Sequence, residues 1–324
     1  MTATATPPPG LAEPAGPSRR RRVTDVIPIS RESRRDQLVI FGIYAFLTLI
    51  VVSILFPLLY VIAASFSSAS AVINGKVWLW PVHPTLTGYA YILHYPGVWE
   101  AYLNSIIYTV AGTVLSVALS VLAGWPLSRP HLYGKRFFIW MFLFAFLFSG
   151  GIVPLFLVVE KLGMINSRLS LIVPGALSIF SIILARSFFQ STVPNELVEA
   201  AEVDGASEFT VLWRVVLPLS KPVLAVLALI FAVAQWNSYF YALIFLNSES
   251  LFPLQLVLRQ VLVLSELPPS AISNLSPQEM QSFQDVQTLV QYTLIIVGSL
   301  PMLILYPLAQ KYFVKGLRVG SLKG

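Results

Sequence analysis

Six long apolar runs divide this chain of 324 residues and constrain its fold more than any other feature. Each run approaches or exceeds the roughly 20 apolar residues that a helix needs to cross the hydrocarbon layer of a membrane. Because backbone groups in lipid must find partners within their own segment, each run is predicted to form a membrane-spanning helix. The runs are Leu38–Phe66, Tyr102–Leu127, Phe137–Val159, Ser167–Ala185, Leu217–Leu246 and Val286–Leu308. We therefore expect an all-α membrane protein with six transmembrane helices.

Composition agrees with a membrane protein and excludes several kinds of site. The chain is 56% hydrophobic and 11% charged, whereas soluble domains carry about 25% charged residues. It has no cysteine, which excludes disulfides, iron–sulfur clusters and cysteine-ligated zinc. The histidines His83, His94 and His131 are scattered without the spacing of metal ligands. We expect them in interfacial or loop positions and predict no metal site.

The distribution of Lys and Arg predicts that both termini lie on the cytoplasmic side. With the N-terminus placed inside, 17 of the 21 basic residues fall in inside segments. Only Lys76, Lys161, Arg168 and Arg259 fall outside. Basic residues concentrate on the cytoplasmic side of membrane proteins, so this orientation is favoured over its reverse. The net charge of +6 therefore reflects topology and says little about a charged substrate.

The chain is predicted to have three parts: a disordered basic tail over residues 1–36, a transmembrane domain over 37–313 and a cytoplasmic tail over 314–324. Thr2–Pro17 is rich in Pro, Ala and Thr and lacks the apolar core of a signal peptide. A basic run follows, with Arg19–Arg22, Arg31, Arg34 and Arg35 just before the first span. It favours an anchor to anionic lipid headgroups. The alternative is nucleic-acid binding, and we predict membrane lipids and no nucleic acid as its partner.

The inner loop over residues 190–216 contains the most polar internal stretch, the segment Glu199–Ala206. Pro194 suits the first turn of a helix, Gly205 can end that helix in a left-handed conformation, and Ser207 can cap a second helix. We therefore predict a helix-turn-helix loop. The apolar side chains of the second helix are predicted to share one face. They are Phe209, Leu212, Trp213 and Val216.

Two kinds of partner could bind such a loop. An amphipathic hairpin can lie on the membrane surface, but helices that do so are normally basic. The first helix of this loop carries Glu196, Glu199 and Glu202, and its acidity favours a protein partner.

The motif in this loop has a recognisable spacing: Glu-Ala-Ala, three residues, Gly, nine residues, an aliphatic residue, one residue, and Leu-Pro. It resembles the cytoplasmic coupling signature of permease subunits in ATP-binding-cassette importers, with Val215 where Ile is common. From about Leu38 onward the chain is similar to the second, maltose-permease-like subunit of carbohydrate importers. The most similar group imports oligosaccharides, including alginate and pectin fragments. Further stretches that carry the resemblance are Asn104-Ser105, Pro194–Pro222, Trp236–Ser238, Pro253–Gln255 and Gln310–Gly316.

The resemblance implies a heterodimer with a second permease subunit, two ATP-binding subunits beneath it, and an extracytoplasmic solute-binding protein, in a bacterial inner membrane. It also implies that the outer loop Asn247–Asp285 reaches the binding protein and that the C-terminal tail reaches the ATPase. The residues matching the ATPase-coupling signature are Glu199, Ala200, Ala201, Asp204, Gly205, Ala206, Leu217 and Pro218. The chain contains no G-x-x-x-x-G-K-[ST] phosphate loop. We therefore expect no enzymatic activity and no cofactor here, with ATP and Mg²⁺ bound by the partner ATPase.

Polar and aromatic side chains inside spans five and six are candidates for a substrate path, because such residues are costly in lipid and often functional. They are Gln235, Trp236, Asn237, Tyr239, Tyr241, Gln291 and Tyr292. The alternative is that they hold helices together. The resemblance weakens the substrate assignment, because in maltose-type importers the other permease subunit mainly holds the sugar. Gly150 and Gly151 suggest close packing or a kink in span three, and Glu160, Lys161 and Arg168 suggest interfacial charges or a lining for an anionic sugar.

Three other classes of membrane protein compete with this interpretation. An ion-coupled secondary carrier would carry carboxylates within its spans or two matching halves with broken helices, and neither is evident. A membrane-embedded enzyme would need a metal cluster or a nucleophile constellation within the spans, and none is present. An importer of another solute class, such as amino acids, shares the coupling signature, and only the wider resemblance argues against it.

Overall fold

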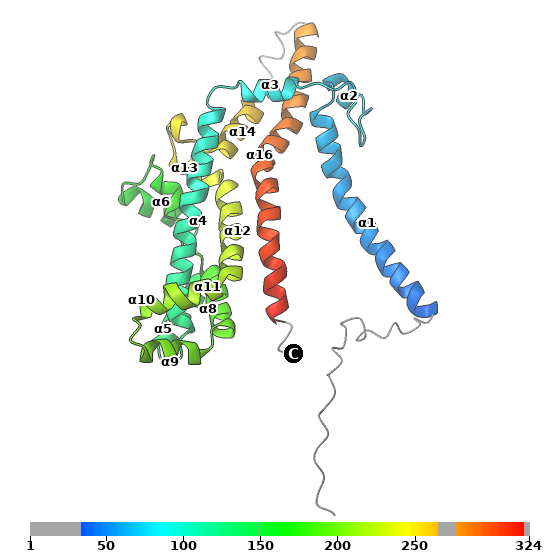
Figure 1. Ribbon diagram of the computed structural model, residues 1–324. Coiled ribbons are helices and arrows are strands. Elements are labelled where there is room, and N and C mark those ends of the chain that lie inside the picture. The colour runs from blue at the N-terminus through cyan, green and yellow to red at the C-terminus, as the bar shows by residue number, and fades with distance from the viewer. Residues whose placement is uncertain (1–33, 149, 265–276, 321–324) are drawn as a thin grey trace, which may run out of the picture. The chain divides into compact units, whose positions relative to one another are not determined.

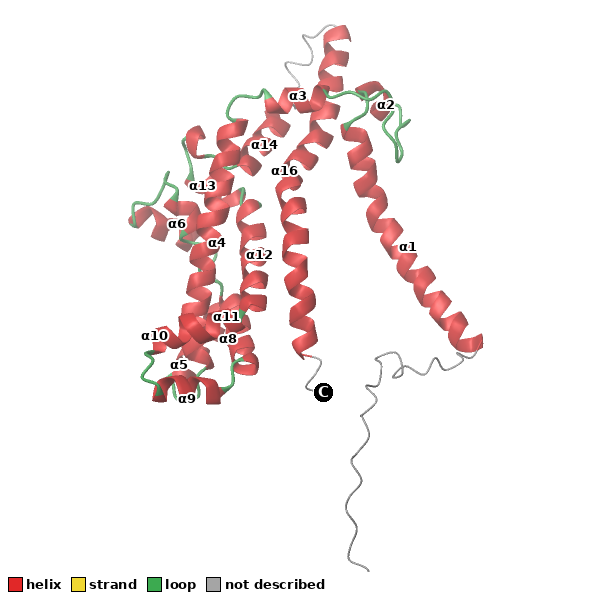
Figure 2. Ribbon diagram, in the orientation of Figure 1, coloured by secondary structure: helices red, strands yellow, loops and turns green. Residues whose placement is uncertain are grey.

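The structure is a computed structural model that describes residues 34–148, 150–264 and 277–320. These residues are almost entirely helical, and no strand occurs among them (Figure 2). The predicted all-α fold is therefore confirmed. The chain separates into two compact units, Met1–Phe56 and Pro57–Gly324. Most of the predicted basic tail, residues 1–33, lies outside the described residues.

Three helices are single, long and apolar enough to cross a membrane: α1 (Arg34–Ser65), α4 (Val98–Ser128) and α16 (Pro277–Gly320). Their apolar stretches correspond to predicted spans one, two and six. None of the most apolar window of α1 is buried within this chain. Apolar surface of that extent is suited to lipid or to another membrane helix. The helix α16 continues through Gly320, past the predicted domain boundary at residue 313.

The remaining three predicted spans are not single helices. Span three forms α5 (Lys135–Leu147) and α6 (Ile152–Lys161), whose axes differ by 114°. Span four forms α7 (Leu169–Ile172) and α8 (Ile179–Thr192), with Pro174 and Gly175 between them. Span five forms α11 (Leu217–Leu219), α12 (Lys221–Trp236) and α13 (Phe240–Phe245), with a bend of 84° before α12.

The physical reasons for these breaks are local. Gly151 has a φ of +76°, in the left-handed region that disfavours other residues. Pro174 has no N–H to continue the helix of span four. In span five the polar residues 237–239 interrupt the apolar run, and Asn237 Nδ2 donates to the Val233 carbonyl at 2.8 Å, at the end of α12.

Short helices occupy the segments predicted to lie outside the membrane. They are α2 (Ala69–Ile73), α3 (Thr87–Leu93), the 3₁₀ turn η3 (Glu249–Leu251) and α14 (Leu254–Leu264). The helix α14 presents Leu254, Leu258 and Val261 to the interior of the Pro57–Gly324 unit, where all three are buried.

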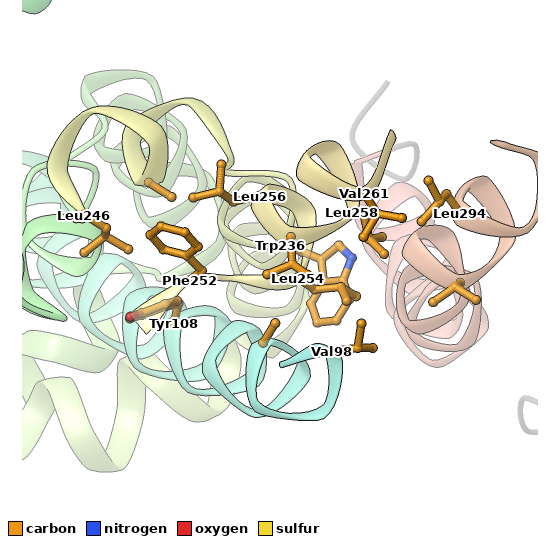
Figure 3. Packing of buried hydrophobic residues seen from close by; sticks show 14 of the residues in the cluster. Val98, Tyr108, Trp236, Leu246, Phe252, Leu254, Leu256, Leu258, Val261 and Leu294 are labelled. Atoms are coloured by element: carbon orange, nitrogen blue, oxygen red, sulfur yellow. The ribbon is translucent and has the colours of Figure 1, made fainter. Parts of the chain in front are cut away.

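Within the Pro57–Gly324 unit, α4 lies against both α8 and α12, and α12 also lies against α16 (Figure 1). The largest buried cluster joins Tyr108 of α4, Trp236 of α12, Leu254 of α14 and Leu294 of α16 (Figure 3). Full burial of a large apolar side chain stabilises a fold by about 1.5–3 kcal/mol. This cluster therefore fixes α12, α14 and α16 around one end of α4.

A proline explains one of the bonds in this cluster. Pro301 has no N–H, so the Val297 carbonyl one turn earlier in α16 loses its usual partner. The Tyr102 hydroxyl donates to that carbonyl at 2.8 Å. The neighbouring Gly298 carbonyl accepts from Trp236 Nε1 at 2.9 Å and from Gln255 Nε2 at 3.3 Å. Side chains from three elements thus satisfy the weakened turn of α16.

The polar residues near the start of α4 hold the segment between α13 and α14. Asn104 Nδ2 donates to the carbonyls of Ser250 at 2.8 Å and Phe252 at 3.2 Å. The Tyr108 hydroxyl donates to the Leu251 carbonyl, and the Leu254 N–H donates to Ser105 Oγ at 2.7 Å. These side chains satisfy backbone groups that have no partner in regular structure.

We expect Asn104→Ala to lower the melting temperature of the purified protein. The substitution removes both donated bonds and leaves backbone carbonyls unsatisfied, which costs about 1–3 kcal/mol. Asn74→Ala is the matched control, because Asn74 Nδ2 donates to the Ser70 carbonyl at an exposed position. Thermal unfolding in detergent measures both variants. An equal fall in melting temperature in the two would show that the buried bonds stabilise the fold no more than the exposed one.

Candidate functional site

The segment 194–216 forms two helices joined by a tight turn, and we refer to it as the hairpin. Its first helix, α9, spans Asn195–Val203, and its second, α10, spans Glu208–Val211. The Ser207 Oγ accepts the Thr210 N–H at 3.3 Å and caps α10. The backbone of Pro194 is extended, and the helix begins at the next residue.

The turn of the hairpin has a specific geometry that explains its glycine. Gly205 has a φ of +79°. Its N–H donates to the Glu202 carbonyl at 3.0 Å, and the Ala206 N–H donates to the Ala201 carbonyl at 2.9 Å. These two bonds define a Schellman motif, which closes the C-terminus of a helix and requires a left-handed residue at this position.

The small residues of the hairpin let it pack closely on the rest of the unit. Val198 is fully buried, and Ala201 and Ala206 pack against the cluster that includes Phe189 and Val211. Glu199, Ala200 and Asp204 are exposed. One side of α9 therefore faces the protein, and the acidic side is available to a partner.

The predicted apolar face of the second helix is wrong in part. Residues Leu212–Val216 form a π-helical turn. Leu212 and Val216 are buried, but Phe209 and Trp213 are about 60% exposed. The rings of Phe209 and Trp213 are in edge-to-face contact, with their centres 6.0 Å apart. A π-turn accommodates more residues per turn than an α-helix and so shifts which side chains share a face. Leu217 and Pro218 follow in the short helix α11 (Leu217–Leu219), where Leu217 packs against the same buried cluster as Val216.

Polar side chains join the hairpin and α8 to the end of α4. The last carbonyls of a helix lack intrahelical partners, and cations are favoured near them. Arg186 Nε donates to the Leu127 carbonyl at 3.1 Å, and Gln190 Nε2 donates to the Ser128 carbonyl at 3.2 Å. Arg129 Nη1 donates to Asn195 Oδ1 at 3.1 Å, so α9 is linked directly to α4. We call these three contacts the α4 clamp.

A hollow of about 710 Å³ opens between the hairpin and the end of α4. Its wall includes Glu199 and Glu202 from α9, Glu208 from α10, and Trp125 and Arg129 from the other side. The Arg129 guanidinium lies 5.2 Å from the centre of the Trp125 ring. The acidic residues of the motif thus face an open, partly aromatic surface.

A second cavity, of about 830 Å³, lies where the broken spans meet, and we call it the central cavity. Four of the seven residues predicted for a substrate path line it: Gln235, Asn237, Tyr239 and Tyr241. Ser238 lines it as well. Its volume falls in the range of about 300–1,000 Å³ typical of small-molecule sites.

The other three predicted residues lie elsewhere. Trp236 is buried and donates to the Gly298 carbonyl, which supports the alternative that it holds helices together. Tyr292 makes an edge-to-face contact with Tyr60 at 5.9 Å. Gln291 is exposed, and it does not line the central cavity.

Sequence reasoning missed the opposite wall of the central cavity, which comes from the breaks in spans three and four. Gly150, Gly151, Pro154 and Gly175 line this wall. The signal that could have found it was the glycine and proline interruption of apolar runs, which marks binding sites in transporters. Arg168 lies outside the cavity and donates to Asn104 Oδ1 at 3.2 Å.

Gln235 joins the central cavity to α4. A Cβ added to Gly112 of α4 would lie 2.5 Å from Gln235 Nε2, and one added to Gly175 would lie 3.8 Å from it. The Gln235 side chain therefore passes directly over the bare backbone of α4. Among the described residues no hydrogen-bond partner is found for its amide, which leaves this group available to a ligand in the cavity.

These features define a class: an apolar helical membrane subunit with a polar hairpin at one end and a lined cavity between broken spans, as in transport permeases. Residues 97–319 match the family described as the binding-protein-dependent transport system inner membrane component, and the chain belongs to this family. The resemblance drawn from the sequence is confirmed. The chain is accordingly a multi-pass permease of the inner membrane.

Individual relatives agree with this assignment. The chain is 38% identical over 268 residues to protein LplC of Bacillus subtilis, covering 83% of this chain and 89% of that protein. It is 36% identical over 282 residues to the polygalacturonan/rhamnogalacturonan transport system permease protein YtcP of the same organism, covering 87% and 97%. It is also similar to a chain in the crystal structure of a bacterial ABC transporter involved in the import of the acidic polysaccharide alginate. That match has a TM-score of 0.78 and 33% identity, and it covers 87% of this chain and 99% of the other.

We expect Gly205→Ala to loosen the hairpin turn. A left-handed conformation costs a non-glycine residue about 1–2 kcal/mol, so the Schellman bonds should open more often. Hydrogen–deuterium exchange of the amides of residues 204–206 should accelerate by about tenfold, while amides in α12 are unchanged. Gly205→Asn is the matched variant, because Asn tolerates this conformation better and should show a smaller effect. Equal amide exchange rates in wild type and both variants would show that the left-handed conformation at position 205 does not require glycine.

Proposed function

We propose that this chain is a permease subunit of an ATP-driven importer of oligosaccharides, and that the hairpin receives the mechanical input from a partner ATPase. The observation that carries this proposal is that one helix, α4, contacts both sites. The α4 clamp ties its C-terminal end to the hairpin, and Gly112 in its middle lies against Gln235 of the central cavity. Movement of the hairpin would therefore reach Gln235 in the cavity wall through α4.

The chemistry of the hairpin supports an ATPase as its partner. The exposed side of α9 is acidic and the Schellman turn makes it compact, so it can enter a cleft on another protein. Such a cleft would need basic or hydrogen-bonding groups to pair with Glu199 and Asp204. The positive-inside rule supports a cytoplasmic position for the hairpin and both termini. ATP and Mg²⁺ would then bind the ATPase, and this chain would catalyse no reaction.

The complete importer would contain a second permease subunit, two ATP-binding subunits and an extracytoplasmic solute-binding protein. Exposed apolar side chains along α1 and α5, such as Phe41, Phe137 and Trp140, support extensive contact with lipid and with a second membrane subunit.

The substrate is assigned from the relatives and from the cavity wall. The relatives named above include a polygalacturonan/rhamnogalacturonan transport system permease and a chain of an ABC transporter involved in the import of alginate. The central cavity combines the aromatic rings of Tyr239 and Tyr241 with the amides of Gln235 and Asn237. Aromatic faces pack on sugar rings, and amides bond hydroxyl groups, so this lining suits an oligosaccharide. Fragments that carry carboxylates, such as those of pectin or alginate, fall within the proposed class.

The test is reconstitution of the chain with its candidate partners in proteoliposomes, followed by measurement of ATP hydrolysis and sugar uptake with loaded binding protein. Stimulation of hydrolysis by a sugar-loaded binding protein, together with uptake of that sugar, is expected. A complex that assembles but moves amino acids and no oligosaccharide would overturn the substrate assignment.

We expect Glu199→Lys to weaken the coupling between the partner ATPase and this chain. The substitution reverses a charge on the exposed side of α9, and replacing an attractive charge by a like charge costs an interface several kcal/mol. Stimulated ATP hydrolysis should fall at least about tenfold, while membrane insertion is unchanged. Glu160→Lys, at the exposed end of α6, is the matched control and should behave as wild type. Normal coupling in Glu199→Lys would remove the hairpin from the proposed mechanism.

We expect Gln235→Leu to weaken sugar uptake and Gln291→Leu to leave it unchanged, although the sequence made both residues candidates for the substrate path. Gln235 lines the central cavity and Gln291 does not. Loss of the Gln235 amide should raise the KM for sugar uptake by roughly threefold to tenfold, because one hydrogen bond contributes about 0.5–1.5 kcal/mol. Unstimulated ATP hydrolysis should not change. Equal effects of the two substitutions would argue that the cavity is not on the sugar path.

A further inference from the structure

An arginine stands beside the central cavity in an unusual setting. Arg259 of α14 has its guanidinium 5.8 Å from the centre of the Tyr239 ring, and Tyr239 lines the central cavity. Arg259 itself lines a separate hollow of about 440 Å³ together with Gly97, Glu249 and Gln260. Through the Tyr239 ring, this cation is in contact with the proposed sugar path.

Beside its contact with the Tyr239 ring, no hydrogen bond of the Arg259 side chain is found among the described residues. A guanidinium that lies over an aromatic ring uses its face, and its five N–H donors point outward in its own plane. Among the described residues no carboxylate lies within 4.0 Å of it, although Glu249 borders the same hollow. The planar fork of donors matches the two oxygens of a carboxylate.

Arg259 is also held in place by its helix. The Leu254 N–H donates to Ser105 Oγ at 2.7 Å, and Leu258 and Val261 are buried on either side of Arg259 in the sequence. The side chain of Arg259 itself is exposed. A fixed helix therefore presents an exposed cation next to Tyr239, a residue of the cavity wall.

The other outer cations differ from Arg259. Arg168 donates to Asn104 Oδ1 and so belongs to the network that holds the segment before α14. Lys161 is exposed at the end of α6, and neither Lys161 nor Arg168 lies over the ring of a cavity residue as Arg259 does. In the part of the chain that the structure describes, Arg259 is the outer cation stacked on a residue of the cavity wall.

We propose that Arg259 binds the carboxylate of an acidic sugar at the entrance of the central cavity and sets the preference for uronate-containing over neutral oligosaccharides. This inference rests on the proposed function, because it assigns a substrate class to the same cavity. Arg259 binds the substrate and takes part in no reaction. Its partner is a sugar carboxylate, and contact with the binding protein is the competing outcome of the test.

The first experiment compares trigalacturonate with its methyl ester, which has the same sugar chain but no charge. Both are offered to the reconstituted importer that contains wild-type chain, Arg259→Gln or Arg259→Lys. Arg259→Gln should raise the KM for trigalacturonate about tenfold, the loss expected when a charge-assisted bond is removed, and should leave the methyl ester unaffected. Arg259→Lys should recover part of the loss, because Lys keeps the charge without the planar fork.

Lys161→Gln is the control for a simple change of surface charge, and it should not alter the ratio between the two sugars. The ratio of the two KM values in each variant is divided by the ratio in wild type. This cancels any charge preference of the binding protein, because that protein is the same throughout. If Arg259→Gln raised the KM for both sugars equally, the proposal would be overturned and contact with the binding protein would be indicated.

A second measurement does not depend on transport. The chain has no cysteine, so Ser238→Cys places one reactive thiol in the central cavity. Trigalacturonate should slow alkylation of this thiol in the purified complex, and adding Arg259→Gln should abolish the protection. Equal protection with and without Arg259 would overturn the inference even if no sugar is transported. Absence of uptake in wild type would count against the proposed function alone.

Discussion

Close packing of α4 against α8 and α12 is the constraint on which the rest of the structure depends. At Gly124 an added Cβ would lie 2.9 Å from the Cβ of Ala185 and 3.1 Å from the Arg186 backbone nitrogen. At Gly112 it would meet the Gln235 side chain. Membrane helices gain no hydrophobic driving force from association in lipid, so small residues that allow close backbone approach supply the contact. Larger side chains on this side of α4 would push α8 and α12 away from it.

The residues on the same side of α4 are polar as well as small. The hydroxyls of Thr109, Ser116 and Ser120 are buried and find no partner among the described residues, and Ser181 of α8 shares this condition. Unpaired buried hydroxyls are costly, so this surface is less firmly held than an apolar one of equal area. The ends of α4 are held more strongly, by Asn104 and Tyr108 at one end and by the α4 clamp at the other. A helix that is fixed at its ends and loosely bonded in its middle is suited to transmit displacement.

The hairpin could be predicted from the sequence because its structure is local. Pro194, Gly205 and Ser207 each encode one backbone feature within a few residues, and the structure has a helix start, a left-handed turn and an N-cap at or next to these positions. The packing of its second helix could not be predicted, because the π-turn at Leu212–Val216 depends on burial against α8 and α12. Of the central cavity, the sequence predicted only the wall that span five contributes. Its other wall depends on how the halves of spans three and four fold back, and that is a tertiary event.

The three breaks share a physical logic. Backbone that is not helical leaves polar groups unpaired, and in lipid this is tolerated only where the chain is buried in protein or borders an aqueous cavity. The breaks at Gly150-Gly151, at Gly175 and at Asn237–Tyr239 all border the central cavity. Three unrelated interruptions would not be expected to meet at one place if each were an isolated packing defect. Their convergence supports the proposed passage of a polar ligand there, which would account for the amides and tyrosines at this level of span five.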